Sequence, residues 1–163
     1  MNFEMDLSRA IFPALITLHL SECCADIKGS SFPALRYLYS ESDAITGAMD
    51  ILSGEWPALE TAKFMRQGDG PVLRENFPSL KRLYLIRCFD PSLEGKFPNL
   101  RYLATKDTNN PRFSTSSLLN IRWRSYDGGS TWSSSTMPIS TNGMQNMPQL
   151  FSTSEVMDFD DGN

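Results

Sequence analysis

The sequence contains a single histidine, three cysteines and no long apolar run. One histidine excludes most histidine-based catalysis and most zinc sites. Cys23, Cys24 and Cys88 are odd in number and two are adjacent, which fits neither a disulfide framework nor a paired-cysteine metal site. No stretch approaches the ~18 apolar residues of a membrane span, and the N-terminus lacks the basic start of a signal peptide. We therefore expect a cytoplasmic protein without metal, cofactor or membrane insertion.

Basic residues are absent from the C-terminal part of the chain. Residues 1–126 hold all 15 Lys and Arg against 14 Asp and Glu, whereas residues 127–163 hold five acids and no base. The second segment opens with Ser and Gly and contains four of the eight methionines. We divide the chain into a body, 1–126, and an acidic tail, 127–163, which is either disordered or a loose C-terminal cap.

The body is built from a repeat. An aromatic-Pro-x-Leu motif occurs five times, and its prolines are 20, 24, 21 and 20 residues apart. The five motifs start at Phe12, Phe32, Trp56, Phe77 and Phe97. Each copy continues with mostly apolar or small residues at fixed positions, most fully in Leu80-Lys-Arg-Leu83-Tyr-Leu85-Ile-Arg-Cys88. A sixth copy without the Phe-Pro pair is predicted to start at Leu118.

The spacing of the leucines predicts strands. Leu83 and Leu85 alternate with polar or aromatic residues, which is the period of a strand with one buried face. Strands of about five residues, one every ~20, stack in parallel on one another rather than forming hairpins. We expect each proline to lead into its strand in an extended conformation, and the aromatics before the prolines to form a second buried column.

These residues resemble the leucine-rich repeat family, whose unit is L-x-x-L-x-L-x-x-N/C-x-L with periods of about 20–29 residues. The resemblance covers about residues 7–126. It implies an α/β solenoid of five to six repeats, with a curved parallel sheet on the concave face and an irregular or short helical convex side. At the N-terminal end three alternatives stay open: residues 2–9 form a minimal helical cap, the chain is part of a longer array, or a partner covers this end. Cys23 and Cys88 take the N/C position, where we expect buried, inert thiols that meet backbone amides.

The resemblance also implies a non-catalytic function, since members of the family mostly bind proteins. The candidate partner-binding residues are those that point out of the concave face: His19, Tyr37, Tyr39, Lys63, Arg82, Tyr84, Tyr102, Lys106 and Arg122. The middle column is predicted as His19, Tyr39, Lys63, Tyr84, Ala104 and Arg122, with successive residues ~5 Å apart. Five bases (Lys63, Arg82, Lys106, Arg122 and Arg124) accompany one acid, Glu41. Tyr and Arg are favoured at protein interfaces, so we expect a protein or peptide partner of acidic character.

Several alternatives remain open. Exposed strand positions are also rich in Lys, Arg and Tyr because these residues solvate a sheet. The chain is alternatively a structural segment that self-associates end to end, or an adaptor piece of a larger leucine-rich repeat receptor or ubiquitin-ligase substrate receptor. The acidic tail, 127–163, could instead lie across the basic face. Nucleic acid is disfavoured because the bases form no dense cluster. Catalysis is disfavoured because His19 should point outward and Cys23 inward.

Overall fold

The computed structural model describes residues 3–6, 11–21, 23–41, 52–66, 68, 70–109, 111–114 and 120–134. In these ranges the chain forms thirteen short strands and one 3₁₀ turn, η1 (Gly29–Ser31). The longest sheet contains β2 (Thr17–Ser21), β4 (Tyr37–Glu41), β6 (Thr61–Met65), β8 (Arg82–Ile86), β10 (Tyr102–Lys106), β12 (Trp123–Ser125) and β13 (Ser133–Ser134). Two three-stranded sheets contain β1 (Phe3–Asp6), β3 (Cys23–Lys28) and β5 (Leu52–Ser53), and β7 (Val72–Leu73), β9 (Ser92–Leu93) and β11 (Arg112–Phe113).

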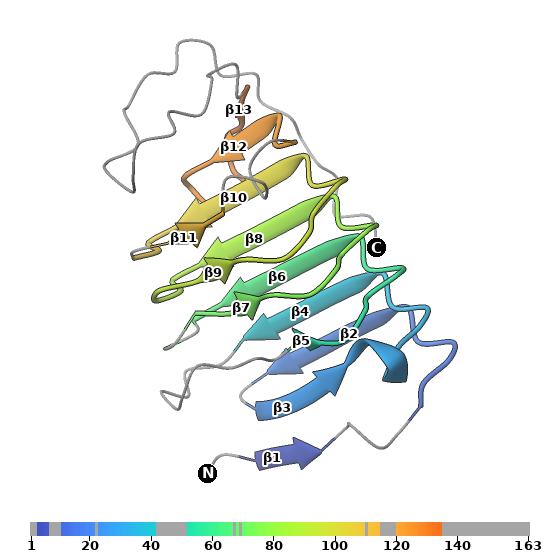
Figure 1. Ribbon diagram of the computed structural model, residues 1–163. Coiled ribbons are helices and arrows are strands. Elements are labelled where there is room, and N and C mark those ends of the chain that lie inside the picture. Colours follow the sequence, from blue (N-terminus) through green and yellow to red (C-terminus); the bar gives the residue numbers. More distant parts are fainter. Residues whose placement is uncertain are drawn as a thin grey trace.

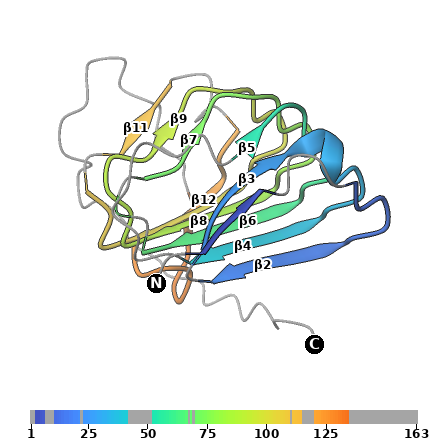
Figure 2. The ribbon, with the colours of Figure 1, turned by 90° about the horizontal axis from the view of Figure 1, so that it is seen from below.

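The strands wind into a parallel-strand β-solenoid of about four turns. The seven-stranded sheet has the order β13-β12-β10-β8-β6-β4-β2, and from β12 to β2 strands that are neighbours in the sheet are one turn apart in the sequence (Figure 1). The two shorter sheets lie on the opposite side of the coil (Figure 2). All pairs are parallel except β12 and β13, which are antiparallel. The predicted stacking of parallel strands is therefore confirmed.

The described residues support the solenoid but not the α/β class, because they contain no α-helix. The side opposite the seven-stranded sheet consists of two- to six-residue strands and turns. Only residues 87–96 connect β8 to the next aromatic motif, and they include Pro91 and Gly95. A segment this short, interrupted by Pro and Gly, is too short to nucleate a stable α-helix. Within the segment predicted as an N-terminal cap, β1 is a strand that pairs with β3.

The register of the first five copies agrees with the repeat. In the seven-stranded sheet His19 lies beside Tyr39, Tyr39 beside Lys63, Lys63 beside Tyr84, and Tyr84 beside Ala104. The first five residues of the predicted middle column are therefore neighbours. The alternate residues Leu38, Leu83 and Leu103 point into the core and are at most 2% exposed.

The predicted register of the sixth copy is wrong. Trp123 pairs with Tyr102, and Ser125 pairs with Ala104, so Ser125 and not Arg122 continues the middle column. Arg122 instead precedes β12, where its amide donates to the carbonyl of Arg101. The buried Ile121 therefore corresponds to Leu100, the leucine that follows the Phe-Pro pair. This copy has no Phe-Pro pair to mark its first leucine, and Leu118 and Ile121 are both apolar candidates for that position. Leu118, from which the sequence-based register was counted, lies outside the described residues.

The aromatic-Pro-x-Leu motif forms a β-turn, not an extended entry to the strand. The amide of Leu35 donates to the carbonyl of Phe32 at 3.1 Å, and Leu80 donates to Phe77 at 3.3 Å. Proline at the second position of such a turn fixes φ near the required value and removes no necessary donor. The turn places the aromatic and the leucine on the same, inner side of the coil.

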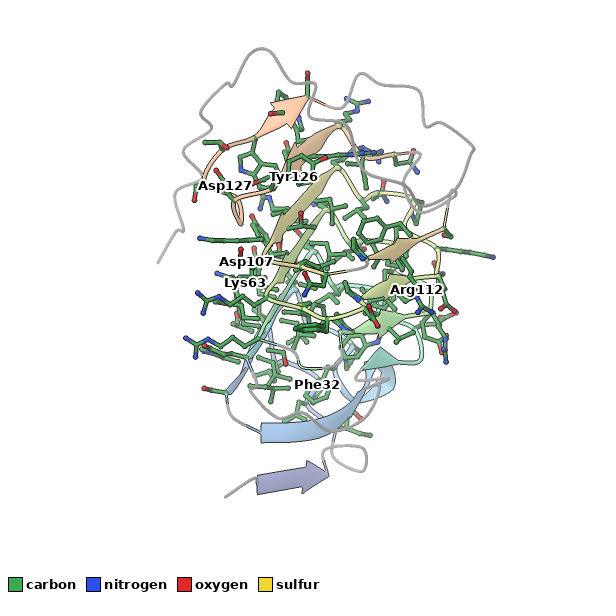
Figure 3. The ribbon with its side chains drawn as sticks, turned by 90° about the vertical axis from the view of Figure 1, so that its left-hand side faces the viewer. Phe32, Lys63, Asp107, Arg112, Tyr126 and Asp127 are labelled. Carbon is green, nitrogen blue, oxygen red and sulfur yellow. The ribbon has the colours of Figure 1, made fainter. Side chains whose placement is uncertain are left out.

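The aromatics form the expected buried column. Phe12 stacks on Phe32 with ring centroids 5.2 Å apart, Phe32 on Trp56 at 6.3 Å, and Phe77 on Phe97 at 5.3 Å. All but Phe12 are at most 3% exposed, and Phe32 lies inside the coil in Figure 3. Each buried ring contributes about 1.5–3 kcal/mol through burial alone.

The N/C position of the repeat is occupied as predicted at Cys88, but its contacts differ. The Cys88 thiol is fully buried and donates to the carbonyls of Phe64 and Ile86, each at 3.6 Å. In the next copy the Thr108 hydroxyl makes the same pair of bonds, to Leu85 at 2.8 Å and Lys106 at 3.1 Å. The position therefore satisfies carbonyl groups rather than amides. The side chain of Cys23 lies outside the described part of the molecule.

Candidate recognition face

The outward side of the seven-stranded sheet, called the outer face below, carries eight of the nine predicted partner-binding residues. Among them, His19 and Lys106 are exposed, and Tyr37, Tyr39, Lys63, Arg82, Tyr84 and Tyr102 are half-buried. Arg122 is exposed but precedes β12 and lies outside the predicted column. In Figure 3 Lys63 projects from the outer face and Arg112 from the opposite side of the coil.

The C-terminal half of the outer face is covered by residues 126–132, which we call the covering loop. Trp132 is only 1% exposed, and its indole packs edge-on against Tyr84 at 6.1 Å and Tyr102 at 5.6 Å between ring centroids. Ala104, which lies on β10 with Tyr102 and pairs with Tyr84, is fully buried. Its methyl group leaves room in the middle column, and the indole takes the place of a large side chain there. The tyrosines of β8 and β10 are therefore packed against the protein's own tryptophan.

Asp127 holds the covering loop in shape. Its carboxylate accepts hydrogen bonds from the Ser125 hydroxyl at 2.7 Å, the Thr131 amide at 2.9 Å and the Thr131 hydroxyl at 2.6 Å. The Ser125 hydroxyl in turn accepts from the amide of Gly129 at 2.8 Å. Burial raises the pKa of Asp127, but the hydrogen bonds to Thr131 and Ser125 outweigh it and lower the pKa to about 2. The loop therefore depends on an ionised carboxylate.

Two glycines allow the covering loop to approach the sheet. Gly128 and Gly129 have φ of 82° and 101°, a region that disfavours residues with a Cβ. A Cβ on Gly129 would lie 2.9 Å from Cε1 of Tyr84. The Gly128 amide donates to the carbonyl of Thr105 at 3.2 Å, which joins the loop to β10. The Ser/Gly-rich start of the predicted tail is therefore packed on the outer face where the structure describes it.

The outward residues of β2, β4 and β6 form the other half of the outer face, which we call the open half. His19 packs edge-on against Tyr39 with ring centroids 6.2 Å apart, and Lys63 is the next residue of the same column. Beside them Tyr37 has the Arg36 guanidinium 5.6 Å from its ring centroid. The open half thus presents a row of imidazole, phenol and ammonium groups, which combine apolar area with hydrogen-bond donors.

The outer face is less basic than the sequence predicted. Arg124 aligns with the inward Leu103, and Arg122 lies outside the column, so Lys63, Arg82 and Lys106 are the outward bases. Arg82 places its guanidinium 5.6 Å from the ring centroid of Tyr102, next to the covered region. In the open half, Lys63 is accompanied by Glu41, which pairs with Arg66 at 3.2 Å. The open half is therefore polar and aromatic with little net charge.

Metal-ligating groups and free thiols are few in the described part of the chain. No group of three His, Cys, Asp or Glu side chains within it could hold a metal ion. The described free thiol, Cys88, is buried at a corner of the coil. Within the same residues, no helix is long and apolar enough to cross a membrane. What the outer face can supply is a surface for binding.

Sequence reasoning missed the role of Trp132. The residue lies in a Ser/Gly-rich stretch without the repeat pattern, which predicted tail rather than packed structure. The available signal was the pair Gly128-Gly129 directly after the last copy, followed by a tryptophan, because such a pair permits a tight reversal. The small Ala104 in a column of large side chains was the complementary signal.

Comparison of the chain with protein-family models, curated proteins and solved structures finds no match.

Proposed function

We propose that the chain is a leucine-rich repeat protein that recognises a protein or peptide partner, without catalysis, through the open half of the outer face. The family assignment is supported by five concordant copies of the motif, stacked in one register. It is supported further by the corner position, where Cys88 and Thr108 make the same carbonyl contacts.

The observation that carries the binding proposal is that, within the described residues, the covering loop packs on one half of the outer face and leaves the open half uncovered. Tyr84 and Tyr102 pack edge-on against Trp132 of the covering loop, whereas Tyr39, which is half-buried like them, packs against the exposed His19 of the same sheet. Aromatic rings held by neighbouring strands lose little conformational entropy on binding, so they suit an interface. A merely solvated sheet would not need His19 and Tyr39 stacked edge to face.

The low net charge of the open half changes the expected partner. Lys63 supplies one cation and Glu41 is already paired with Arg66. The partner in our proposal is thus a protein surface or peptide with hydrogen-bond acceptors and an apolar patch, with at most one acidic group opposite Lys63.

The proposal can be tested by photo-crosslinking in source cells. A benzophenone amino acid replaces Tyr39 in one variant and Phe89 in a control; Phe89 is 54% exposed and lies outside the seven-stranded sheet. We expect a discrete crosslinked protein with the probe at position 39 and none of the same mass with the probe at position 89. The same product from both positions, or from neither, would contradict recognition by the open half.

A further inference from the structure

The two ends of the seven-stranded sheet differ. At the C-terminal end β13 pairs antiparallel with β12, through Trp123–Ser134 and Arg124–Ser133. At the N-terminal end the sheet stops at β2, which among the described residues pairs with β4 alone. A free edge strand is a template for another strand, and proteins usually protect such edges.

The columns of aromatic and leucine side chains that are buried elsewhere in the coil become exposed at this end. Phe12 is 36% exposed, whereas the four aromatics that follow it in the column are at most 3% exposed. Ile11 and Ile16, which flank the Phe12 turn, are 72% and 51% exposed. Leu15 and Leu18 are half-buried, while the corresponding Leu35 and Leu38 are at most 1% exposed. One further layer of the coil would bury all of these side chains.

The backbone of β2 is oriented for pairing. The amides of Arg36 and Tyr37 donate to the carbonyl of Ile16, so Ile16 and the alternate residues after it direct their polar groups toward β4. By the alternation of a strand, Thr17, His19 and Ser21 direct their N–H and C=O groups to the edge. Three residues thus present donors and acceptors in the pattern that a parallel strand requires.

No charge protects the edge. β2 contains no Asp, Glu, Lys or Arg, whereas β4, β6, β8, β10 and β12 each contain at least one. Charged side chains on edge strands discourage the addition of other strands. β13 at the other end of the sheet also lacks them, but it is only two residues long.

The opposite side of the coil limits what can dock. β3 follows β2 in the same turn, and β1 extends its sheet by one strand beyond β3 (Figure 1). Among the described residues the seven-stranded sheet has no strand level with β1, so the end of the coil is a step one strand wide. A symmetric pairing of β2 with β2 of a second copy would place the second copy's β3 at the level that β1 already occupies. The step fits a single strand.

We propose that the edge of β2 binds one extended segment of a partner protein, about five residues long, parallel to β2 and apolar at alternate positions. The inward side chains of the segment cover Leu18 and Leu20, and an aromatic or aliphatic residue before it stacks on Phe12. Main-chain hydrogen bonds to Thr17, His19 and Ser21 hold it, and its alternate apolar side chains give specificity. The site uses the main-chain edge of β2 rather than the outward side chains of the open half, and it does not depend on recognition by those side chains.

A peptide with the sequence of residues 77–87 of this chain is a suitable probe, because it carries one complete repeat motif and its strand. Binding of the labelled peptide to the full chain is followed by fluorescence anisotropy. We expect saturable binding, and about tenfold or more weaker binding by Thr17→Pro, which removes an edge-facing N–H while keeping the bonds to β4. The control peptide replaces the residues equivalent to Leu83 and Leu85 with Asp and should not bind.

Two further variants keep the result decisive. Ile16→Lys leaves every amide in place but puts a charge at the exposed apolar end, so it should weaken binding even if Thr17→Pro does not fold. Lys63→Glu, in the open half but on β6 rather than beside β2, should bind the peptide like the parent, which separates the two proposals. The β2 site would be overturned if the parent chain showed no saturable binding of the peptide. It would also be overturned if Ile16→Lys bound the peptide as tightly as the parent and the parent bound the control peptide as tightly as the original one.

Discussion

The indole of Trp132 stands perpendicular to the ring of Tyr102, with an interplanar angle of 89° and 5.6 Å between ring centroids. This contact joins a residue beyond the last repeat to the outward side of β10. It completes the middle column above Ala104 and closes one half of the outer face. The covering loop thus both covers the C-terminal end of the seven-stranded sheet and forms the boundary of the open half.

Removal of the indole should destabilise the C-terminal end. We expect Trp132→Ala to lower the free energy of unfolding by about 3–5 kcal/mol, the usual range for loss of a buried aromatic. Urea denaturation followed by circular dichroism measures the change. Trp132→Phe, which keeps a ring over Ala104, should recover much of the loss, and equal losses in both variants would argue against the packing described here.

The ionised carboxylate of Asp127 should make stability depend on pH. Because its pKa is about 2 in the folded chain and near 3.9 in unfolded peptides, its stabilisation is present above about pH 4 and disappears as pH falls toward 2. Asp127→Asn should therefore be less stable than the parent at neutral pH, and the two should converge at about pH 2. Denaturation curves at several pH values test this, and a constant difference between parent and variant would contradict it.

Substitutions of Cys88, at the corner position, should separate the contribution of hydrogen bonding to stability from that of side-chain size. Cys88→Thr should change the free energy of unfolding little, because Thr108 already makes the same bonds one copy later. Cys88→Val has a similar volume but no donor and should lose about 0.5–1.5 kcal/mol, the usual net contribution of a hydrogen bond, since the Ile86 carbonyl still accepts from the amide of Arg66. If valine is tolerated as well as threonine, the thiol contacts contribute nothing to stability.

Substitutions in the aromatic column should lower the stability of the chain most when they fall in the middle of the column. Phe77 is fully buried and stacks on Phe97 with planes 3° apart, whereas Phe12 at the open end is 36% exposed. Phe77→Ala should therefore cost about 3–5 kcal/mol, and Phe12→Ala clearly less. Thermal unfolding of the two variants beside the parent decides the order, and a larger loss at Phe12 would reverse it.

The repetitive features of the structure were predictable from the sequence. The five motifs fixed the register that places His19 beside Tyr39 and Lys63, because each leucine must face the core. Features outside the repeat were not predictable in the same way. The frame of β12 was missed because Leu118 and Ile121 are equally apolar, and the packing of Trp132 depends on the space above Ala104, two strands away in the sheet. The absence of α-helix from the described residues follows from connections too short to form one.

The central claim is recognition through the open half, and a quantitative pull-down from source-cell lysate tests it most directly. The baits are the parent chain, the double variant Tyr39→Ala, Lys63→Glu, and the control Arg112→Glu, an exposed change on the opposite side of the coil (Figure 3). Each bait is first shown to unfold like the parent. We predict a partner that the parent and Arg112→Glu retain equally and the double variant loses. A partner retained by the double variant, or lost equally from the control, would contradict the account.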